Sequence, residues 1–371
     1  PMTSACGRYV ACFNGEIYNF QELRAELAAE GVAFRTSGDT EVVVNGFAVW
    51  GEAVAEKLWG MFAVSVWDTQ TETMTLFRDR TGQKPLVMAS LRCGGIAFAS
   101  EATPLIAAGF ADPTPDPETL WTYLTHGYTF GEQAFCQGLR RVPPASIVRW
   151  SRADGLGQPR RYWSARGAGG EAPSNEAEAE EQFTSLLRDA VRRRKVADVP
   201  LGAFLSGGVD SGVICALAAG DGEPLRTFSV GYRERSYSEL PEAQRTAESI
   251  GTDHTETVLA ASSLDVLDHA IAAIDEPLAD TSIVPTAALC RWAREYVTVA
   301  LSGDGGDELL AGYITHQADA MLERLAFVPR GVWRVGSRLA GVLPDSDRKV
   351  NAIFKAKQFL AGASLDPDAA H

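Results

Sequence analysis

Leu205-Ser206-Gly207-Gly208-Val209-Asp210-Ser211 is the stretch that decides the fold of the second half of the chain. An apolar run, residues 199–205, precedes it and an apolar-periodic run, residues 213–217, follows it, so the predicted order is strand, glycine turn and helix. Such a turn aims backbone N–H groups, two hydroxyls and a helix N-terminus at one place, which suits an anion. Asp210 adds a carboxylate, so we expect the anion to arrive with a divalent cation. The alternative is a glycine turn that only joins a strand to a helix, and the two serines and the aspartate count against it.

A second loop of this kind, Ser302-Gly303-Asp304-Gly305-Gly306-Asp307-Glu308, follows the apolar run 297–301. Its acids and glycines have little structural purpose, and neither the Asp-x-Asp-x-Asp-Gly spacing of a calcium loop nor a Walker Gly-Lys-Ser/Thr is present. Ligands of parallel α/β sheets bind beyond the carboxyl ends of the strands. Two such loops at one edge therefore predict a magnesium–nucleotide site, with Asp210 and Asp307 as metal ligands.

The rest of the chain divides by its pattern. Residues 1–150 are β-rich, and residues 151–178, rich in Gly, Ala and Glu, are interpreted as a linker. From 179 to 371 helical and strand-like runs alternate, which predicts β-α-β crossovers and a parallel sheet. The expected strands are 9–13, 62–67, 73–77, 86–89, 96–99, 199–205, 226–232, 255–259 and 296–301. The expected helices are 20–30, 40–51, 180–194, 238–250, 264–274 and 285–295.

Composition excludes several classes. The chain has 371 residues, an apolar fraction of 46% and a charged fraction of 22%, typical of a soluble globular protein. A formal net charge of −14 argues against nucleic acid as a partner. No apolar run approaches the ~18 residues of a membrane span, and no signal peptide opens the sequence, so a cytoplasmic location is expected. The six cysteines form no C-x-x-C pair, so their spacing supports neither a zinc site nor a redox-active dithiol.

The N-terminal motifs have plain interpretations when they are taken singly. Asn14-Gly15-Glu16-Ile17-Tyr18-Asn19 contains the commonest hairpin-turn dipeptide. In Ser37-Gly38-Asp39-Thr40-Glu41, Asp39 or Thr40 could cap the helix that follows. The run 78–85, Arg-Asp-Arg-Thr-Gly-Gln-Lys-Pro, could be a charged turn.

Taken together and in this order, these N-terminal motifs and the two later loops resemble glutamine-hydrolysing asparagine synthetases. The resemblance covers nearly the whole chain. It implies a class II glutamine amidotransferase domain, an antiparallel β-sandwich flanked by helices of the N-terminal-nucleophile hydrolase type, followed by a parallel-sheet α/β ATP-pyrophosphatase domain. Asp275-Glu276-Pro277 and the residues 281–285 also resemble the segment that lines the synthetase site of that family.

In the first domain of that family, an N-terminal cysteine hydrolyses glutamine, and its own α-amine, with a pKa of roughly 7.7–8.0, acts as the base. Asn14 and the N–H of Gly15 match the oxyanion hole, which stabilises charge as it develops. Glu16 and Asp39 match the groups that hold the α-amino end of glutamine.

In the second domain, ATP converts the β-carboxylate of aspartate into β-aspartyl-AMP, from which ammonia displaces AMP. Leu205 and Val230 match positions that contact the adenosine. The pyrophosphate is cradled by Ser206, Gly207, Gly208, Val209, Asp210 and Ser211. Ser302 and Gly303 also line the nucleotide, and Asp304 matches an acid linked to adenylate formation. The expected partners are aspartate, glutamine or ammonia, ATP and Mg²⁺, without nucleic acid or membrane, and a homodimer is the assembly considered.

The chain departs from the family at its ends. Family members begin Met-Cys-Gly and carry a His-Arg-Arg segment that clamps the glutamine carboxylate, whereas Pro1-Met2 resembles a segment downstream of both. Cys6 and Cys12 do not replace the nucleophile, because neither is terminal and Cys12 lies in an expected strand. We therefore expect a fragment of a longer protein that lacks glutaminase activity by itself and stops, at His371, before the later synthetase helices.

Other readings remain open. A relative used in secondary metabolism, such as a β-lactam synthetase, would keep the fold and the ATP chemistry, but the set Asn14, Glu16 and Asp39 favours a protein that still binds glutamine. A protein that binds nucleotide without catalysis is the alternative from another class. The loop carboxylates at metal-ligand positions count against it.

Overall fold

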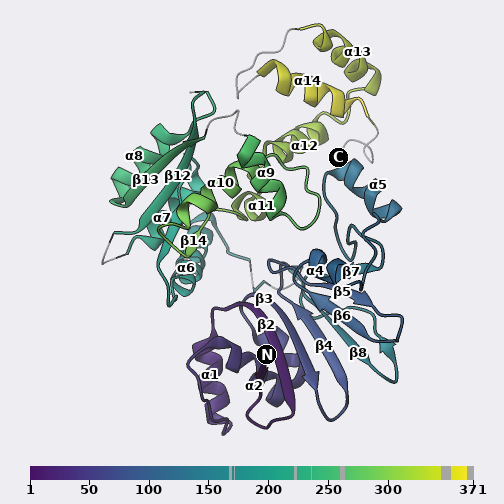
Figure 1. Ribbon diagram of the computed structural model, residues 1–371. Helices are drawn as coiled ribbons and strands as arrows, with labels where there is room; N and C mark the ends of the chain where they lie inside the picture. The colour runs from purple at the N-terminus through teal and green to yellow at the C-terminus, as the bar shows by residue number, and fades with distance from the viewer. Residues whose placement is uncertain are drawn as a thin grey trace. The chain divides into compact units, whose positions relative to one another are not determined.

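A computed structural model describes residues 1–166, 169–170, 172–220, 224–234, 236–259, 264–343 and 352–365 (Figure 1). The described chain divides into two compact units, residues 1–196 with 267–284, and residues 197–266 with 285–371. Residues 167, 168 and 171 of the expected linker and the terminal residues 366–371 lie outside the described ranges. Within those ranges, no helix is both long and apolar enough to cross a bilayer.

Antiparallel sheets form the centre of the first unit, as expected. The larger sheet has the strand order β1-β2-β3-β4-β8-β10, with β9 paired to β8, and the smaller sheet has the order β6-β5-β7. Their strands are β1 (Met2–Thr3), β2 (Tyr9–Ile17), β3 (Gly60–Asp68), β4 (Thr73–Arg78), β5 (Val87–Ser90), β6 (Ile96–Ala99), β7 (Leu139–Arg141), β8 (Ser146–Ser151), β9 (Gly155–Leu156) and β10 (Arg160–Arg161). Leu76 and Val148 of the larger sheet share a buried cluster with Met88 of the smaller one, so the sheets pack face to face.

Helices α1 (Phe20–Ala29) and α2 (Asp39–Trp50) cover the other face of the larger sheet. Leu23 and Leu27, four residues apart and therefore on one helix face, are buried against this sheet, as the sequence predicts. The remaining helices of this unit are η1 (Gly51–Ala53), α3 (Val54–Lys57), α4 (Ala102–Ala107), α5 (Pro117–His126) and α6 (Glu176–Arg194). The pattern did not predict α4 or α5, although Asp116 caps α5 and Gly127 ends it in a left-handed conformation.

Two local features of this unit differ from the plainest interpretation of the sequence. Asn14-Gly15 does not turn the chain, because β2 continues to Ile17 and pairs with β3 throughout. The cause is packing: a Cβ at Gly15 would lie 2.1 Å from the carbonyl oxygen of Met61, so the glycine permits close pairing. Residues 151–161, expected to open the linker, instead extend the larger sheet through β9 and β10.

The second unit is a parallel sheet with the strand order β13-β12-β11-β14. Its strands are β11 (Leu201–Phe204), β12 (Arg226–Tyr232), β13 (Asp253–Leu259) and β14 (Val299–Leu301). Its helices are α7 (Val209–Ala218), α8 (Leu240–Ile250), α11 (Gly306–Leu310), α12 (Ile314–Arg324), α13 (Arg330–Gly341) and α14 (Ala352–Ala363). Helices α9 (Leu264–Ala273) and α10 (Ile283–Ala293) each cross a boundary between the two units, at residues 267 and 285. The chain runs from β11 outward to β12 and β13, then returns to add β14 on the other side of β11. This reversal is a topological switch point, where ligands of such sheets bind.

Candidate functional site

The first loop leaves the end of β11 and leads into α7, as the sequence predicts. Gly208 is the N-cap of α7 in an extended conformation, and Ser206 to Val209 are exposed. The amide of Ser206 donates to Ser211 Oγ at 3.0 Å, and the amide of Gly208 donates to Ser206 Oγ at 3.1 Å. The two hydroxyl oxygens lie 2.9 Å apart. The serines therefore hold the loop in a shape that presents N–H groups at the N-terminus of α7, which suits a phosphate.

The second loop packs directly on the first. A Cβ at Gly303 would lie 2.7 Å from the amide nitrogen of Ser211, and a Cβ at Gly306 would lie 2.8 Å from Asp210 Oδ2. A side chain at Gly303 would clash with the backbone of the first loop, whereas one at Gly306 would displace the carboxylate of Asp210. The structure thus brings Ser302–Glu308 and the first loop together at the carboxyl ends of the neighbouring strands β11 and β14.

The acids of the second loop have different surroundings. Ser302 Oγ donates to Asp304 Oδ2 at 2.8 Å, and Asp304 is exposed. Asp307 lies beside Gly312, where a Cβ would approach its Oδ1 to 2.1 Å. Across the described residues, no group of three or more His, Cys, Asp or Glu side chains could hold a metal ion. Mg²⁺ needs fewer protein ligands when a nucleotide supplies phosphate oxygens, so Asp210 suits a nucleotide-bound metal better than a protein-only cage.

A tyrosine–glutamate pair at the end of this loop was missed by the sequence reasoning. Tyr313 donates its hydroxyl hydrogen bond to Glu308 Oε1 at 2.5 Å. The same hydrogen bond raises the pKa of Tyr313 to about 12 and lowers the pKa of Glu308. The five-residue spacing is not a recognised pairing pattern, so the sequence offered no signal for it.

The expected adenosine contacts, Leu205 and Val230, lie at the ends of adjacent strands. Leu205 is buried, its amide donates to the carbonyl oxygen of Phe228 at 2.9 Å, and its own carbonyl accepts from the hydroxyl of Ser229. Val230 is half-buried. The side chain of Leu205 and both of its backbone polar groups are therefore engaged within the sheet.

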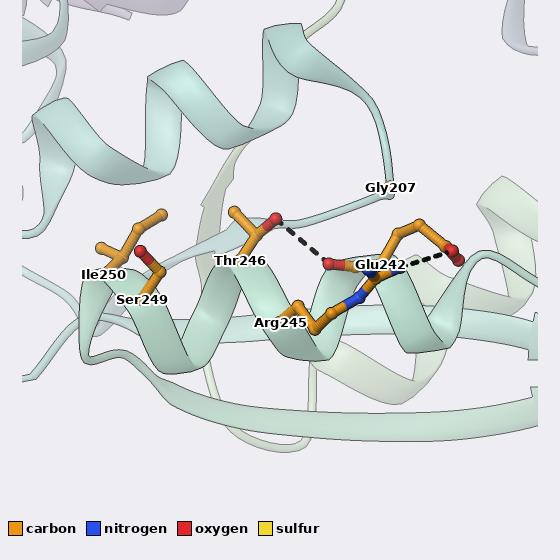
Figure 2. Close-up of a pocket in the computed structure, with 6 residues that line it drawn as sticks. All are labelled: Gly207, Glu242, Arg245, Thr246, Ser249 and Ile250. Atoms are coloured by element: carbon orange, nitrogen blue, oxygen red, sulfur yellow. Dashed lines mark hydrogen bonds and ion pairs between the residues drawn. The ribbon is translucent and has the colours of Figure 1, made fainter.

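A polar groove adjoins the loop on the side of α8 (Figure 2). Its volume is about 390 Å³, and it is lined by Gly207, Glu242, Arg245, Thr246, Ser249 and Ile250. Arg245 Nη2 donates to Glu242 Oε1 at 2.8 Å, so the two charges in the groove offset one another.

In the first unit, the expected glutamine-binding residues meet at the end of β2. Asn14 Nδ2 donates to Ser100 Oγ at 3.1 Å, and Asn14 and Glu16 are exposed. Asp39 is the first residue of α2 rather than its cap, and its Oδ2 accepts from the amide of Ile17 at 3.0 Å. Asp39 is thereby fixed next to the Asn14–Ile17 end of the strand.

The segment expected to line the synthetase site uses its carboxylates inside the first unit. Asp275 accepts hydrogen bonds from the amides of Ala102 and Thr103, at the N-terminus of α4. Glu276 accepts from the amide of Phe135 at 2.5 Å and forms an ion pair with Arg141. Burial lowers the pKa of Arg141, the nearby charge of Arg78 lowers it further, and the charge of Asp275 opposes this shift.

Comparison with known proteins assigns a family to each half of the chain. Residues 1–163 match the glutamine amidotransferase domain family, and residues 182–364 match the asparagine synthase family. A putative glutamine-hydrolysing asparagine synthetase of Mycobacterium tuberculosis is 37% identical over 92% of this chain and 53% of its own length. Asparagine synthetase 1 of Bacillus subtilis is 32% identical over 94% of this chain and 54% of its own length. Amidase chyE of Penicillium rubens is 28% identical over 95% of this chain and 53% of its own length. The chain spans about half the length of these relatives.

Proposed function

The chain belongs to the family of glutamine-hydrolysing asparagine synthetases, and from this premise we propose that the protein converts aspartate to asparagine with ATP and nitrogen from glutamine. The observation that supports it most is the meeting of the two loops at the switch point of the parallel sheet. An exposed phosphate-type loop and a carboxylate-bearing loop at one edge suit a nucleotide with its metal.

The chemistry proceeds in two displacements. An oxygen of the aspartate β-carboxylate attacks the α-phosphorus of ATP, and pyrophosphate leaves. Ammonia then attacks the acyl carbon of β-aspartyl-AMP, AMP leaves with the carboxylate oxygen, and the new amide nitrogen loses a proton. AMP is a far better leaving group than an oxide ion, which is why the carboxylate is activated first.

Different residues of the second unit would serve different parts of this reaction. The loop of residues 206–211 would cradle the pyrophosphate at the N-terminus of α7, with Ser302, Gly303, Leu205 and Val230 along the nucleotide. Asp210 and Asp307 would hold Mg²⁺, which neutralises phosphate charge when bound. Asp304, exposed beside the loop, would face the acceptor during adenylate formation.

In the first unit, Asn14 and the amide of Gly15 would stabilise the oxyanion of glutamine hydrolysis, and Glu16 and Asp39 would bind the α-amino end of glutamine. We expect the protein to act in the cytoplasm as a homodimer.

Pyrophosphate release by the protein in the presence of aspartate, ATP and ammonium tests the proposal. We expect Asp210→Asn and Asp307→Asn to reduce it by about 100-fold, since each removes a charge that holds the metal. Both variants should also bind ATP more weakly with Mg²⁺ but not without it. Asp253→Asn, an exposed change at the start of β13, is the control. Retained turnover in either loop variant would show that the metal is held elsewhere.

A secondary-metabolite carboxylate is the second candidate acceptor. One relative, amidase chyE, matches along 95% of this chain and is not named for asparagine synthesis, so the acceptor has to be tested. A panel of carboxylates in the same pyrophosphate assay decides between the two. Stimulation by aspartate alone supports asparagine formation, and stimulation by another carboxylate in its place supports the second candidate.

A further inference from the structure

The turn between α11 and α12 (Figure 1) brings the chain back onto the acids of the second loop. Ala311, the C-cap of α11, has φ 55° and ψ 40°, a left-handed conformation that a residue with a Cβ rarely adopts. After this turn Gly312 lies against Asp307, where a Cβ would approach Oδ1 to 2.1 Å, and Tyr313 reaches Glu308. The turn therefore sets which acid of the loop the hydroxyl of Tyr313 meets.

The acids of the two loops differ in what their carboxylates accept. Ser302 Oγ donates to Asp304, and the hydroxyl of Tyr313 donates to Glu308 at 2.5 Å. Within the part of the chain that the structure describes, no hydrogen bond or ion pair engages the carboxylates of Asp210 and Asp307. Hydroxyl donors thus occupy two of the acids, and the two that remain are those proposed to hold the metal.

Glu308 is held back at the start of its own helix. The hydrogen bond from Tyr313 lowers the pKa of Glu308 most, and the backbone amides of Glu308 and Gly305 lower it further. The same hydrogen bond raises the pKa of Tyr313 most, followed by burial and by the charges of Glu308, Asp307 and Asp304. The hydroxyl therefore lies within electrostatic reach of all three loop acids, yet its hydrogen bond goes to Glu308.

The number of available carboxylates decides what such a site can hold. Mg²⁺ is usually bound through one or two carboxylates and the phosphate oxygens of a substrate, whereas an all-protein site needs more ligands. Asp210 and Asp307 fit the first case, since no group of three His, Cys, Asp or Glu in the described ranges could hold a metal ion. A third carboxylate, from Glu308, would let the loops bind a divalent cation before the nucleotide arrives.

We propose that Tyr313 is a positioning residue that keeps Glu308 away from the metal, so that the site takes its divalent cation together with the nucleotide rather than alone. Tyr313 acts through Glu308 and needs no contact with the metal or with ATP. The inference rests on the proposed Mg–ATP site and adds the residue that makes metal binding there depend on phosphate oxygens.

Binding of Mn²⁺ to residues 1–371, measured by electron paramagnetic resonance with and without ATP, tests this inference. Mn²⁺ takes the same oxygen ligands as Mg²⁺. Tyr313→Phe keeps the ring, whose centroid lies 6.0 Å from that of His316, and removes only the hydroxyl. We expect this variant to bind Mn²⁺ alone about fivefold more tightly than wild type, the factor by which one net hydrogen bond opposes the release of Glu308. With ATP present the gain should be smaller, because phosphate oxygens then supply the ligands.

The same substitution in a Glu308→Gln background separates this role from support of the loop. There the loss of the hydroxyl should change the affinity for Mn²⁺ by less than about twofold, because no third carboxylate can be released. Tyr296→Phe removes a hydroxyl from another exposed tyrosine of the second unit and is the matched control. A purely structural effect of Tyr313 would be the same in both backgrounds.

The outcomes distinguish the inference from the proposed function. Equal or weaker binding of Mn²⁺ alone to Tyr313→Phe overturns the inference, as does an equal gain in the Glu308→Gln background. If wild type binds ATP with Mn²⁺ in either of these cases, the proposed nucleotide site stands and the inference alone fails. If wild type binds no ATP with Mn²⁺, the proposed site itself is wrong and the inference falls with it.

Discussion

Single carboxylates fix several turns of the first unit. Asp79 is fully buried, and its oxygens accept from the amides of Phe62, Thr81, Gln83 and Lys84 at 3.0–3.1 Å. Glu41 is also fully buried and accepts from the amides of Arg35 and Thr36. Both residues belong to motifs that carry the family resemblance, yet in this structure their carboxylates accept hydrogen bonds from backbone amides. Buried donors need partners, so the sequence requirement at these positions is structural.

At the residue scale, the Arg8–Asp68 pair makes stability depend on pH. Hydrogen bonds from Arg8, and further ones from Thr71 and Gln70, hold the pKa of Asp68 well below its usual range. A depressed folded pKa contributes stability that is present above the unfolded pKa, roughly 3.9, and is lost as pH falls toward the folded pKa. We expect Asp68→Asn to lower the free energy of unfolding by about 1.5–3 kcal/mol at neutral pH. That deficit should shrink below about pH 4.

Urea denaturation of wild type and Asp68→Asn at a series of pH values measures this difference. Asp198→Asn, a change at an exposed aspartate, controls for the loss of one negative charge. A deficit that stays constant from neutral to acid pH would show that the contribution of Asp68 does not come from its ionised form.

At the element scale, the course of β2 depends on Gly15. A Cβ there would lie 2.1 Å from the carbonyl oxygen of Met61 and 2.7 Å from the Cα of Phe62, both on β3. The clash involves backbone, which cannot move without breaking the pairing of β2 with β3. We expect Gly15→Ala to lower the free energy of unfolding by about 2 kcal/mol or more, whereas Gly169→Ala, which has open space, should change it by less than about 0.5 kcal/mol. Chemical denaturation checks both, and equal effects would contradict the close approach.

Local periodicity explains which elements could be predicted from the sequence. Strand β12 and helices such as α1 and α2 follow their apolar patterns, so their existence and approximate bounds were confirmed. The alternative interpretation of Asn14-Gly15 as a turn fails because cross-strand packing, which has no local signature, outweighs the preference of this dipeptide for turns. Helix α4 was missed because it spans only six residues, whereas α5, as long as α1, was missed although its capping residues stand in the sequence. The fixed positions of α4 and of the loop after α5 depend on contacts with residues 275–279, far along the chain.

The candidate site also contains parts that could be predicted from the sequence and parts that could not. Both glycine-rich loops follow strands, so their placement at one sheet edge could be predicted from the alternation of helix and strand. The contact of Glu239 with the amide of Gly207 could not, because 32 residues of sequence separate the two. Tyr313 lies within five residues of Glu308, but no helical or strand spacing pairs them.

At the scale of the whole molecule, the first unit is built from two separate stretches of chain. Residues 267–284 fold with residues 1–196, although the family match of residues 182–364 assigns them to the synthetase half. Their anchors are Asp275 on the amides of α4, Glu276 on Arg141 and Phe135, and the amide of Ala279 on the carbonyl of Gly127 at 2.8 Å. The amidotransferase half is therefore incomplete without a segment of the other half.

This arrangement predicts opposite effects of one substitution in two polypeptides. In residues 1–371, Arg141→Met leaves the carboxylate of Glu276, whose side chain is 11% exposed, without its cation. Loss of one partner of a buried pair costs about 3–5 kcal/mol, so the free energy of unfolding of the first unit should fall by that order. In residues 1–196, Glu276 is absent and Arg141 is the uncompensated charge. There the same substitution replaces a buried cation with an apolar side chain and should be neutral or stabilising.

Arg140→Met is the matched control, because Arg140 pairs with Glu132, and both are partly exposed and both lie within residues 1–196. Its effect should be small, within about 1 kcal/mol, and the same in both polypeptides. Urea denaturation of the four variants and the two parents gives the comparison. If Arg141→Met destabilises both polypeptides equally, Arg141 acts through contacts inside residues 1–196, and Glu276 does not complete the unit. If the sign or size changes with the length of the polypeptide, the Arg141–Glu276 ion pair joins the two stretches of chain into one folding unit.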